Sequence, residues 1–372
     1  MSSILIKNGT VYDPVLNSMR KGDVAVNDGR IAGEASADAY VVDATGCIVT
    51  TGLIDYHLHV FRKGTESGVH ADVACLPGGV TTCMDGGSAG CGNFTSFYEN
   101  EIVTSTVGLR AMLNVASAGL IGGAVENIRP ESIECGRIKT LFQKYPVLKA
   151  LKLRGSKGVM DEEGAALKLT VSLADEIGCN VVVHVTDPAM PLEKIVSMLR
   201  PGDVCCHVYQ GYGDTALNED GMVKAGLLRA RERGVIFDAC NGRSNFAIEV
   251  AGQCIKEGFL PDIISSDLNA CCYYMRPCVS LTSVMSKYLA FGMKLEDILR
   301  CVTLNPARAL GEADELASLA PGTVGDICIL RVDDCHKPVS DCHGTELMLD
   351  QMINPQMTIK AGEIVYCQNS FA

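Results

Sequence analysis

Short apolar runs rich in valine and isoleucine alternate with longer helical stretches through the middle of this chain, and this alternation most constrains its fold. The helical stretches, such as residues 162–178 and 191–200, carry apolar residues at every third or fourth position. Such alternation is typical of βα units around a parallel sheet, and eight units match the usual length of a (β/α)8 barrel, about 250 residues. We therefore predict an α/β fold with a (β/α)8 (TIM) barrel. Its predicted strands are residues 48–60, 79–87, 110–117, 148–155, 179–185, 203–211, 234–242 and 262–268.

The two ends of the chain have a different pattern. Residues 1–50 and 315–372 contain short alternating runs separated by Asn, Gly and Asp, which favour turns between strands. Neither end has enough strands for a stable sheet of its own. We therefore expect both ends to combine into one small β-sandwich domain, next to a barrel formed by residues 51–314.

Charge and hydropathy exclude two classes of partner. The chain of 372 residues has a formal net charge of -12, and it contains no run of Lys and Arg that could follow a phosphate backbone, so nucleic acid is not expected. No window approaches the roughly 18 apolar residues of a membrane span, and the first residues do not resemble an export signal. We expect no membrane partner.

The cysteines bear on the compartment of the protein. Many of the 18 cysteines lie in apolar runs, as do Cys179, Cys205, Cys240 and Cys328. A thiol in such a run packs as a small apolar group. A chain of this length also needs no disulfide framework. The sequence therefore predicts reduced thiols and a cytoplasmic protein.

Residues 53–60 read LIDYHLHV and place two histidines inside an apolar run. Alternate residues of a strand point to the same face, so His57 and His59 project together. They lie at the carboxyl end of the first predicted barrel strand, where barrel enzymes build their active sites. His184 and His207 hold the same position on the fifth and sixth strands, and Asp267 on the eighth.

These five polar side chains are expected to converge on one cavity. A single histidine at a strand end is most often a hydrogen-bonded core residue, so the prediction depends on their joint placement. An unpaired cluster of this kind would be costly to bury. A bound metal compensates for that cost, and imidazole with carboxylate suits Zn²⁺, Mn²⁺ or Fe²⁺.

The fourth predicted strand, LKALKLRG, adds a lysine to the cavity. Alternation places Lys152 and Arg154 on the inward face, where an ammonium group beside metal ions would be repelled. If Lys152 is deprotonated and reacts with CO2, the resulting carbamate is an anion that can bridge two metals. Alternatively, Lys152 extends to solvent, or Lys149 points inward after a one-residue change of register.

Several motifs together are similar to those of the amidohydrolase superfamily, in its binuclear dihydroorotase- and hydantoinase-like branch, and the resemblance covers nearly the whole chain. Within that branch, residues 85–94 and 285–293 resemble members described as deacetylases or adenine deaminases. An isolated His-x-His would be a weak signal, whereas the combination is specific. The motifs are TGLIDYHLHV, LKLRG, VVHV, CCHVYQG, SSDL, TLNPARALG and PGTVGDICIL.

The resemblance implies a two-metal site and a homo-oligomer. His57, His59 and Asp267 would bind the more buried metal. His184 and His207 would bind the other, with a hydroxide shared between the metals. A carboxylated Lys152 would bridge both. The metal it implies is zinc, with manganese or iron as alternatives.

Two positions differ from the pattern of similar proteins. Asn241 stands where a histidine is expected after the seventh strand, and Asn269 where one is expected after the eighth. Both fall in loops that we expect to contact substrate. The metal chemistry is therefore supported, while the usual substrate of the family is in doubt.

We predict metal-assisted hydrolysis of a C–N bond, or of an ester, in a small acylated or cyclic amide substrate. Asp267 would move the proton from the attacking water to the leaving group. Arg154 would bind a substrate carboxylate, or alternatively brace the barrel mouth. Arg243 and Arg276 are weaker candidates for the same contact.

Two other functions fit part of the sequence pattern. A purine-type deaminase of the same superfamily is one alternative, although mononuclear deaminases lack the bridging lysine. A non-catalytic scaffold is the other, but such proteins lose metal ligands and this chain has all six. The Cys-His pairs within residues 333–344 suggest a second zinc site. We favour a plain polar loop because adjacent Cys and His are awkward joint ligands, and we assign no role to His70.

Overall fold

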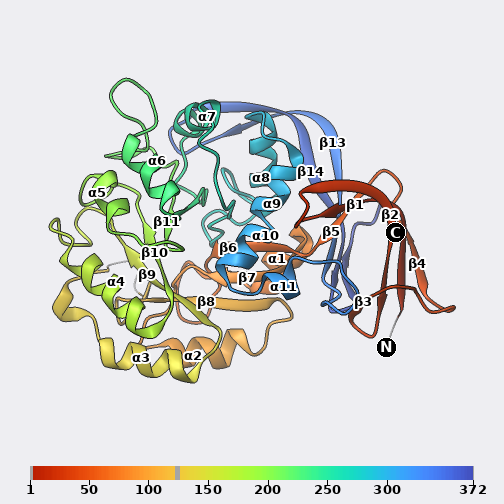
Figure 1. Ribbon diagram of the computed structural model, residues 1–372, viewed down its shortest axis with the longest axis horizontal. Coiled ribbons are helices and arrows are strands. Elements are labelled where there is room, and N and C mark those ends of the chain that lie inside the picture. The colour runs from red at the N-terminus through yellow and green to blue at the C-terminus, as the bar shows by residue number, and fades with distance from the viewer. Residues whose placement is uncertain (1–2, 122–125, 372) are drawn as a thin grey trace.

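The computed structural model describes residues 3–121 and 126–371. The protein has two sheets, and one of them is parallel (Figure 1). Seven strands follow one another in chain order across this sheet, so seven of the eight predicted strands are present. They are β6 (Leu53–Leu58), β7 (Val80–Asp85), β8 (Gly108–Asn114), β9 (Leu148–Arg154), β10 (Asn180–His184), β11 (Val204–Cys206) and β12 (Ile236–Asp238).

The eighth predicted strand, residues 262–268, is an irregular segment. It still lies between the two edges of the sheet: the N–H of Ala239 donates to the Ile263 carbonyl (3.0 Å), and the N–H of Asp267 donates to the His57 carbonyl (2.7 Å). Asp267 has a φ of 50°, in the left-handed region, which interrupts an extended backbone. The regular eight-stranded barrel is therefore corrected to seven strands and one irregular segment.

Three other strands differ most from their predicted limits. The strand expected at 48–60 divides at Gly52 into β5 (Ile48–Thr51), which joins the other sheet, and β6. β11 and β12 have three residues each, shorter than predicted. His207 directly after β11 has a φ of 67° and Cys240 beyond β12 has a φ of 32°, so the extended backbone ends at these points.

The second sheet combines both ends of the chain, as expected. β13 (Ile327–Ser340) is antiparallel to β5, and β5 is parallel to β1 (Ile4–Asp13). β1 pairs with β4 (Tyr40–Asp43) along its first half and with β5 along its second half. All eight strands therefore form one branched sheet instead of the two separate layers of the predicted sandwich. The other strands of this sheet are β2 (Ser18–Asn27), β3 (Arg30–Ala32), β14 (Glu346–Lys360) and β15 (Glu363–Cys367).

Helices cover the outside of the parallel sheet (Figure 1). Strand alternation sends Leu151 of β9 outward into a buried cluster that contains Leu167 of α4, whereas Ala150 and Val182 belong to a second cluster inside the sheet. Burying each large apolar side chain contributes about 1.5–3 kcal/mol. The helices are α1 (Ala71–Cys75), α2 (Phe94–Phe97), α3 (Cys135–Lys144), α4 (Ala165–Ile177), α5 (Leu192–Ser197), α6 (Ala225–Glu232), α7 (Ile248–Lys256), α8 (Leu281–Ala290), α9 (Leu295–Cys301), α10 (Leu304–Ala309) and α11 (Ala313–Leu316).

A long hairpin of β13 and β14 arches from the second sheet over α8 towards α7 (Figure 1). The N–H of Ile353 donates to Ser286 Oγ of α8 (3.0 Å), and the N–H of Ile248 donates to Asp341 Oδ2 (2.8 Å). The plain loop expected over 333–344 is therefore corrected: residues up to Ser340 belong to β13, and the turn follows.

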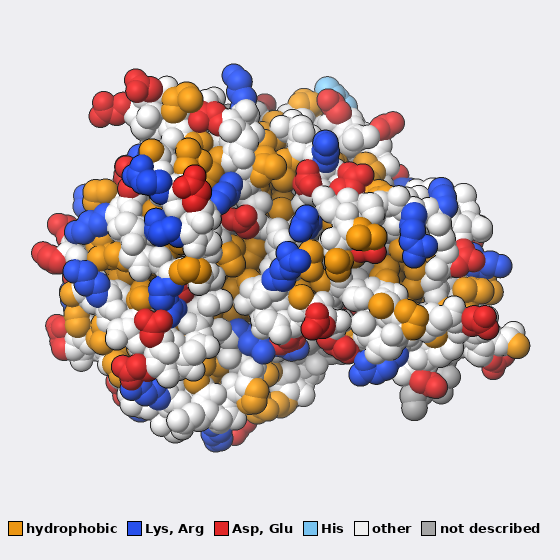
Figure 2. All heavy atoms as spheres, viewed as in Figure 1, with side chains coloured by type: hydrophobic (Ala, Val, Ile, Leu, Met, Phe, Trp, Pro, Cys, Tyr) orange, Lys and Arg blue, Asp and Glu red, His pale blue; other side chains and the backbone are white. Residues whose placement is uncertain are grey.

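The visible surface mixes both signs of charge. Acidic and basic side chains are interspersed over the face seen in Figure 2, without a large basic patch. Within residues 3–121 and 126–371, no helix combines the length and the apolar character needed to cross a bilayer.

Candidate active site

A cavity of about 470 Å³ opens at the carboxyl ends of the parallel strands. It brings together most of the predicted site residues, from strands far apart in sequence. His207 lies directly behind the cavity wall, with its ring centroid 4.3 Å from that of His184. The lining includes His57, His59, Glu66, Asn114, Glu126, Lys152, Arg154, His184, Arg243, Asn245, Asp267 and Asn269.

Hydrogen bonds around His59 determine which of its nitrogens faces the cavity. Ser88 Oγ donates to Asp85 Oδ2 (2.8 Å), so it accepts from His59 Nδ1 (2.9 Å). His59 Nε2 therefore carries a lone pair, and it lies 3.2 Å from Asp267 Oδ1. Two electron-rich atoms at this distance repel each other unless a cation or a proton lies between them. The arrangement suits a metal ion.

His57 extends this set of donors. Its Nε2 lies 3.2 Å from Lys152 Nζ and 3.9 Å from Asp267 Oδ1. Burial lowers the pKa of His57 to about 4, which keeps the imidazole neutral and its lone pair free near neutral pH. Burial alone raises the pKa of Asp267, but the nearby histidines hold it below its ordinary value, so the carboxylate is ionised.

His184 and His207 form a second pair of donors. His207 Nδ1 donates to the Cys240 carbonyl (2.8 Å), which leaves its Nε2 as the acceptor nitrogen. The Nε2 atoms of both histidines are buried and have no hydrogen-bond partner among the described residues. Buried polar atoms without partners are rare and indicate an unaccounted ion or water.

The backbone leaves room beside these nitrogens. A Cβ on Gly86 would lie 2.3 Å from His57 Nε2, so only glycine fits there. Divalent cations fit the convergent lone pairs, the two nitrogens without partners and the space that Gly86 leaves beside His57 Nε2. His57, His59, Asp267, His184 and His207 carry the donor atoms that could hold them, and Lys152 Nζ lies 3.2 Å from His57 Nε2.

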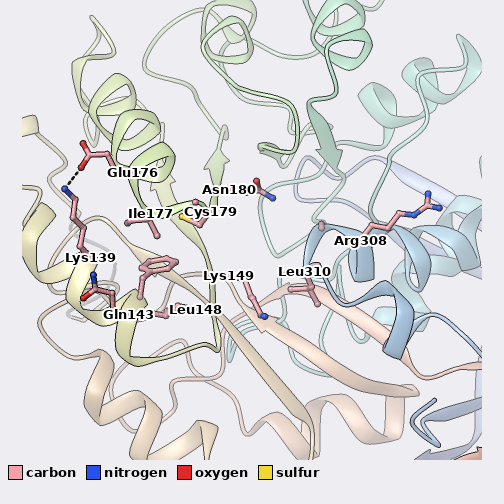
Figure 3. A pocket seen from close by; sticks show the side chains of 14 residues that line it. Lys139, Gln143, Leu148, Lys149, Glu176, Ile177, Cys179, Asn180, Arg308 and Leu310 are labelled. Carbon is pink, nitrogen blue, oxygen red and sulfur yellow. Dashed lines mark hydrogen bonds and ion pairs between the residues drawn. The ribbon is translucent and has the colours of Figure 1, made fainter. Parts of the chain in front are cut away.

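Lys149, the alternative inward lysine, lies at the opposite end of β9. Its Nζ pairs with Glu312 at 2.8 Å. Figure 3 shows it among the residues that line a separate cavity of about 610 Å³, between the amino-terminal ends of β9 and β10 and the chain near Arg308. Lys152, in contrast, is 5% exposed and lines the cavity of the histidines. The register that points Lys152 inward is the one in the structure.

Asn241, predicted to contact substrate, does not line the cavity. It is fully buried, donates through Nδ2 to the Tyr288 hydroxyl (3.0 Å) and accepts from Lys287 Nζ (3.2 Å). Lys287 of α8 is also buried, with the ring of Phe246 5.1 Å away. Asn241 therefore supports the wall behind the site, and its amide holds a buried ammonium group.

We expect Lys287 to cost stability below its pKa. Burial lowers this pKa, against opposing contributions from Cys278 and Asp341. The unfolded chain then binds more protons, so stability rises with pH until about 10.5, the pKa of a free lysine. The unfolding free energy of the native protein, measured by denaturant titration, should increase relative to Lys287→Met as the pH rises towards about 10.5. A difference that falls with pH contradicts this prediction.

The other predicted contacts have varied surroundings. Asn269 lines the cavity, but its amide donates to the Asp267 carbonyl and accepts from the N–H of Cys271. Arg154 and Arg243 both line the cavity. Arg276 is exposed and is not among the lining residues, and His70, next to α1, is also exposed and outside the cavity.

Among the lining residues that the sequence did not predict, three form contacts within the site. Asn245 Nδ2 donates to Asp267 Oδ2 (2.7 Å), and its Oδ1 accepts from Thr186 Oγ1 (3.0 Å). Glu126 is almost fully buried, accepts from Asn114 Nδ2 (2.7 Å) and lies 3.4 Å from an Arg154 nitrogen. Glu126 and Asn245 lie in loops, where no periodicity indicates which side chain points inward, and Asn114 ends β8 without a metal-ligating side chain.

Known proteins resemble the chain over most of its length. A deacetylase from Agrobacterium fabrum is 29% identical over 348 residues, 91% of this chain and 85% of the relative. A crystal structure of a dihydroorotase matches with a TM-score of 0.89 at 26% identity, over 99% of this chain and 98% of the other. A crystal structure of an adenine deaminase matches with the same TM-score at 24% identity, over 99% and 100% of the two chains.

A family model places these similarities in one group. The model described as "Amidohydrolase family" matches residues 48–365, from β5 to β15. This range contains all six residues suited to hold metal. The match confirms the resemblance indicated by the sequence motifs: the chain belongs to the amidohydrolase family.

Proposed function

We propose that this amidohydrolase hydrolyses the C–N bond of an amide or cyclic amide, or an ester bond, in a small acylated or carboxylate-bearing substrate, with two divalent metal ions as cofactors. The observation that carries the proposal is the convergence of imidazole lone pairs on Asp267, with His59 Nε2 3.2 Å from Oδ1. Family membership and the deacetylase and dihydroorotase relatives support the same reaction class.

Six side chains would hold the metals. When bound, the two cations would lower the pKa of a shared water towards about 7 and polarise the scissile carbonyl. Zinc suits imidazole and carboxylate ligands, as do manganese and iron. Lys152, 3.2 Å from His57 Nε2, would serve as a bridging anion once its Nζ carries a CO2-derived carbamate.

Asp267 is the proposed proton carrier. Its Oδ1 faces His59, and its Oδ2 is held by Asn245 on the cavity side. The carboxylate accepts the proton of the attacking water and delivers it to the leaving nitrogen or oxygen. Gly242 makes this possible, because a Cβ there would lie 2.2 Å from Asp267 Oδ2.

Asn245 positions Asp267 through the hydrogen bond from its Nδ2 to Asp267 Oδ2. Asn245→Ala should therefore lower kcat by about 10- to 100-fold, with little change in KM or in bound metal. Asn245→Asp should lower kcat further, because a second carboxylate would face the first. Steady-state kinetics and metal analysis check both variants against Ser244→Ala, an exposed neighbour on the same cavity wall. An Asn245→Asp protein with native kcat contradicts this role.

Arg154 is the proposed anchor for a substrate carboxylate. Its side chain is about one-third exposed and lines the cavity, Nη1 lies 3.4 Å from Glu126, and Nε donates to Ser156 Oγ (3.3 Å). The remaining donors suit a bidentate carboxylate contact. The second lining cation, Arg243, is exposed and lies in the same loop as Asn245.

Arg154→Gln should raise KM for a carboxylate-bearing substrate by about 10- to 100-fold. This factor corresponds to the free energy contributed by a charge-assisted hydrogen bond. The same variant should leave KM for the corresponding carboxamide nearly unchanged, because that substrate carries no anion. Comparing the two substrates in both proteins measures the effect. An equal rise in KM for both substrates would indicate that Arg154 braces the barrel mouth and does not bind the carboxylate.

A direct test of the function combines metal analysis with a substrate screen. Protein prepared with zinc or manganese and bicarbonate is incubated with N-acyl amino acids, cyclic amides, acyl esters and adenine, and the products are identified. Turnover of an amide or an ester supports the proposal. Release of ammonia from adenine alone would favour the deaminase, and a protein with both metals but no turnover in any class would contradict the proposal.

A further inference from the structure

Two thiols lie beneath the histidines of the cavity and have no part in the proposed hydrolysis. Cys206 ends β11 and Cys240 follows β12, and both are fully buried. One donor atom from each of His57, Cys206, His207 and Cys240 lies within 4.8 Å of the other three. Neither thiol belongs to the cavity lining, so this cluster lies behind the set that faces substrate and shares His57 with it.

The contacts orient these donors towards one another. Cys206 Sγ lies 3.2 Å from His57 Nδ1, the nitrogen that faces away from Lys152. The only free nitrogen of His207 is Nε2, because Nδ1 donates to the Cys240 carbonyl. Two sulfurs and two imidazole nitrogens form the donor set of tetrahedral sites for thiophilic cations.

A buried carboxyl group lies beside this cluster. The carboxylate of Asp238, fully buried in β12, lies 3.8 Å from Cys206 Sγ through Oδ2. Ser265 Oγ lies 2.8 Å from both oxygens of Asp238, so the carboxylate is held in place. Burial raises the pKa of Asp238 well above its ordinary value, so a cation here would be bound by the two sulfurs and two nitrogens and not by this carboxyl group.

We propose that His57, Cys206, His207 and Cys240 form a second, soft-metal site that binds one thiophilic divalent cation such as Cd²⁺ and thereby inhibits the enzyme. Binding releases the two thiol protons to solvent and forms two metal–sulfur bonds, with no change of oxidation state. Inhibition follows because His207 has one free nitrogen, which cannot serve both sites. The inhibition rests on the proposed function, whereas the binding does not.

Cadmium titration of the reduced, metal-free, full-length protein tests the site. Thiolate-to-cadmium charge-transfer absorption in the near ultraviolet should grow to one equivalent. Cys206→Ala and Cys240→Ala should each weaken binding by more than about 100-fold, beyond the effect of residues that only support a ligand. Cys205→Ala is the matched control, because this neighbouring thiol is equally buried but packs in the outer apolar cluster.

Cys271 requires its own variant, since it is an exposed thiol that lines the cavity. Cys271→Ala should keep the absorption. If the absorption disappears in Cys271→Ala, or persists in both Cys206→Ala and Cys240→Ala, the proposal is overturned. X-ray absorption of the cadmium-loaded native protein counts the sulfur atoms bound to cadmium and does not depend on how the variants fold. Two sulfur neighbours support the site, and one or none rejects it.

The two proposals fail in distinguishable ways. Absence of turnover in the substrate screen would remove the proposed function and leave the cadmium absorption unaffected. With turnover established, one equivalent of Cd²⁺ should abolish the activity of the native protein and of Cys271→Ala. The same equivalent added to Cys206→Ala should leave most of its residual activity, and full inhibition of that variant would contradict inhibition through the thiols.

Discussion

Lys152→Ala should reduce bound metal from about two equivalents to one or fewer, and should lower kcat/KM by more than about 100-fold. The reason is the position of Nζ, 3.2 Å from His57 Nε2 and 5% exposed, where a carbamate would supply the anion between two cations. Metal analysis and kinetics of protein prepared with bicarbonate measure both effects. A small carboxylic acid such as propionate, which can enter the vacated space, should restore part of the activity.

Lys149→Ala is the matched control for this prediction. Lys149 lies on the same strand but pairs with Glu312 at the opposite end of the sheet. Its removal should leave metal content and turnover close to native. If Lys152→Ala retains two metals and native activity, the carbamate and its bridging role are wrong. If both variants lose metal equally, the loss reflects damage to β9.

Asp267→Asn should lower kcat by about 100- to 10,000-fold, the usual contribution of a positioned acid or base. The substitution keeps the size of the side chain and its contact with Asn245, but removes the negative charge beside His59. Metal content must be measured with kcat, because weaker metal binding would also slow the reaction. The decisive comparison is kcat per fully loaded site, obtained at saturating metal.

Asp262→Asn controls for the segment that carries Asp267. Asp262 lies at the other end of residues 262–268, where its Oδ2 accepts from the N–H of Phe237 (2.8 Å) and pairs with Arg231 at 3.5 Å. This variant should lose some stability and little activity. Native kcat in a metal-loaded Asp267→Asn protein would exclude Asp267 as the proton carrier.

Much of the fold follows from local patterns in the sequence. The period-two alternation of LKALKLRG separates Leu151, in the outer cluster, from Lys152, at the cavity. The same alternation brings His57 and His59 to the carboxyl end of β6. These patterns depend on neighbouring residues, which is why seven strands and the position of the cavity were predictable.

The loops were less predictable, because contacts between distant residues determine their conformation. Asp55 Oδ1 accepts from the N–H of Ser266 (3.0 Å), across more than 200 residues of sequence, and holds the irregular segment against β6. Asn241 and Asn245 lie four residues apart in one loop. The structure turns the first towards Lys287 behind the wall and the second towards Asp267 in front of it.

The sequence by itself determined the alternation of strands and helices, the joining of both chain ends, the family, and the set of histidines, lysine and aspartate that meet at one edge of the sheet. Only the tertiary structure decided that residues 262–268 are irregular, that Asn245 holds Asp267, and that two thiols lie beneath His57 and His207. The physical reason is that periodicity reports the face of a strand, whereas the direction of a loop side chain depends on which remote hydrogen bonds and buried charges it can satisfy.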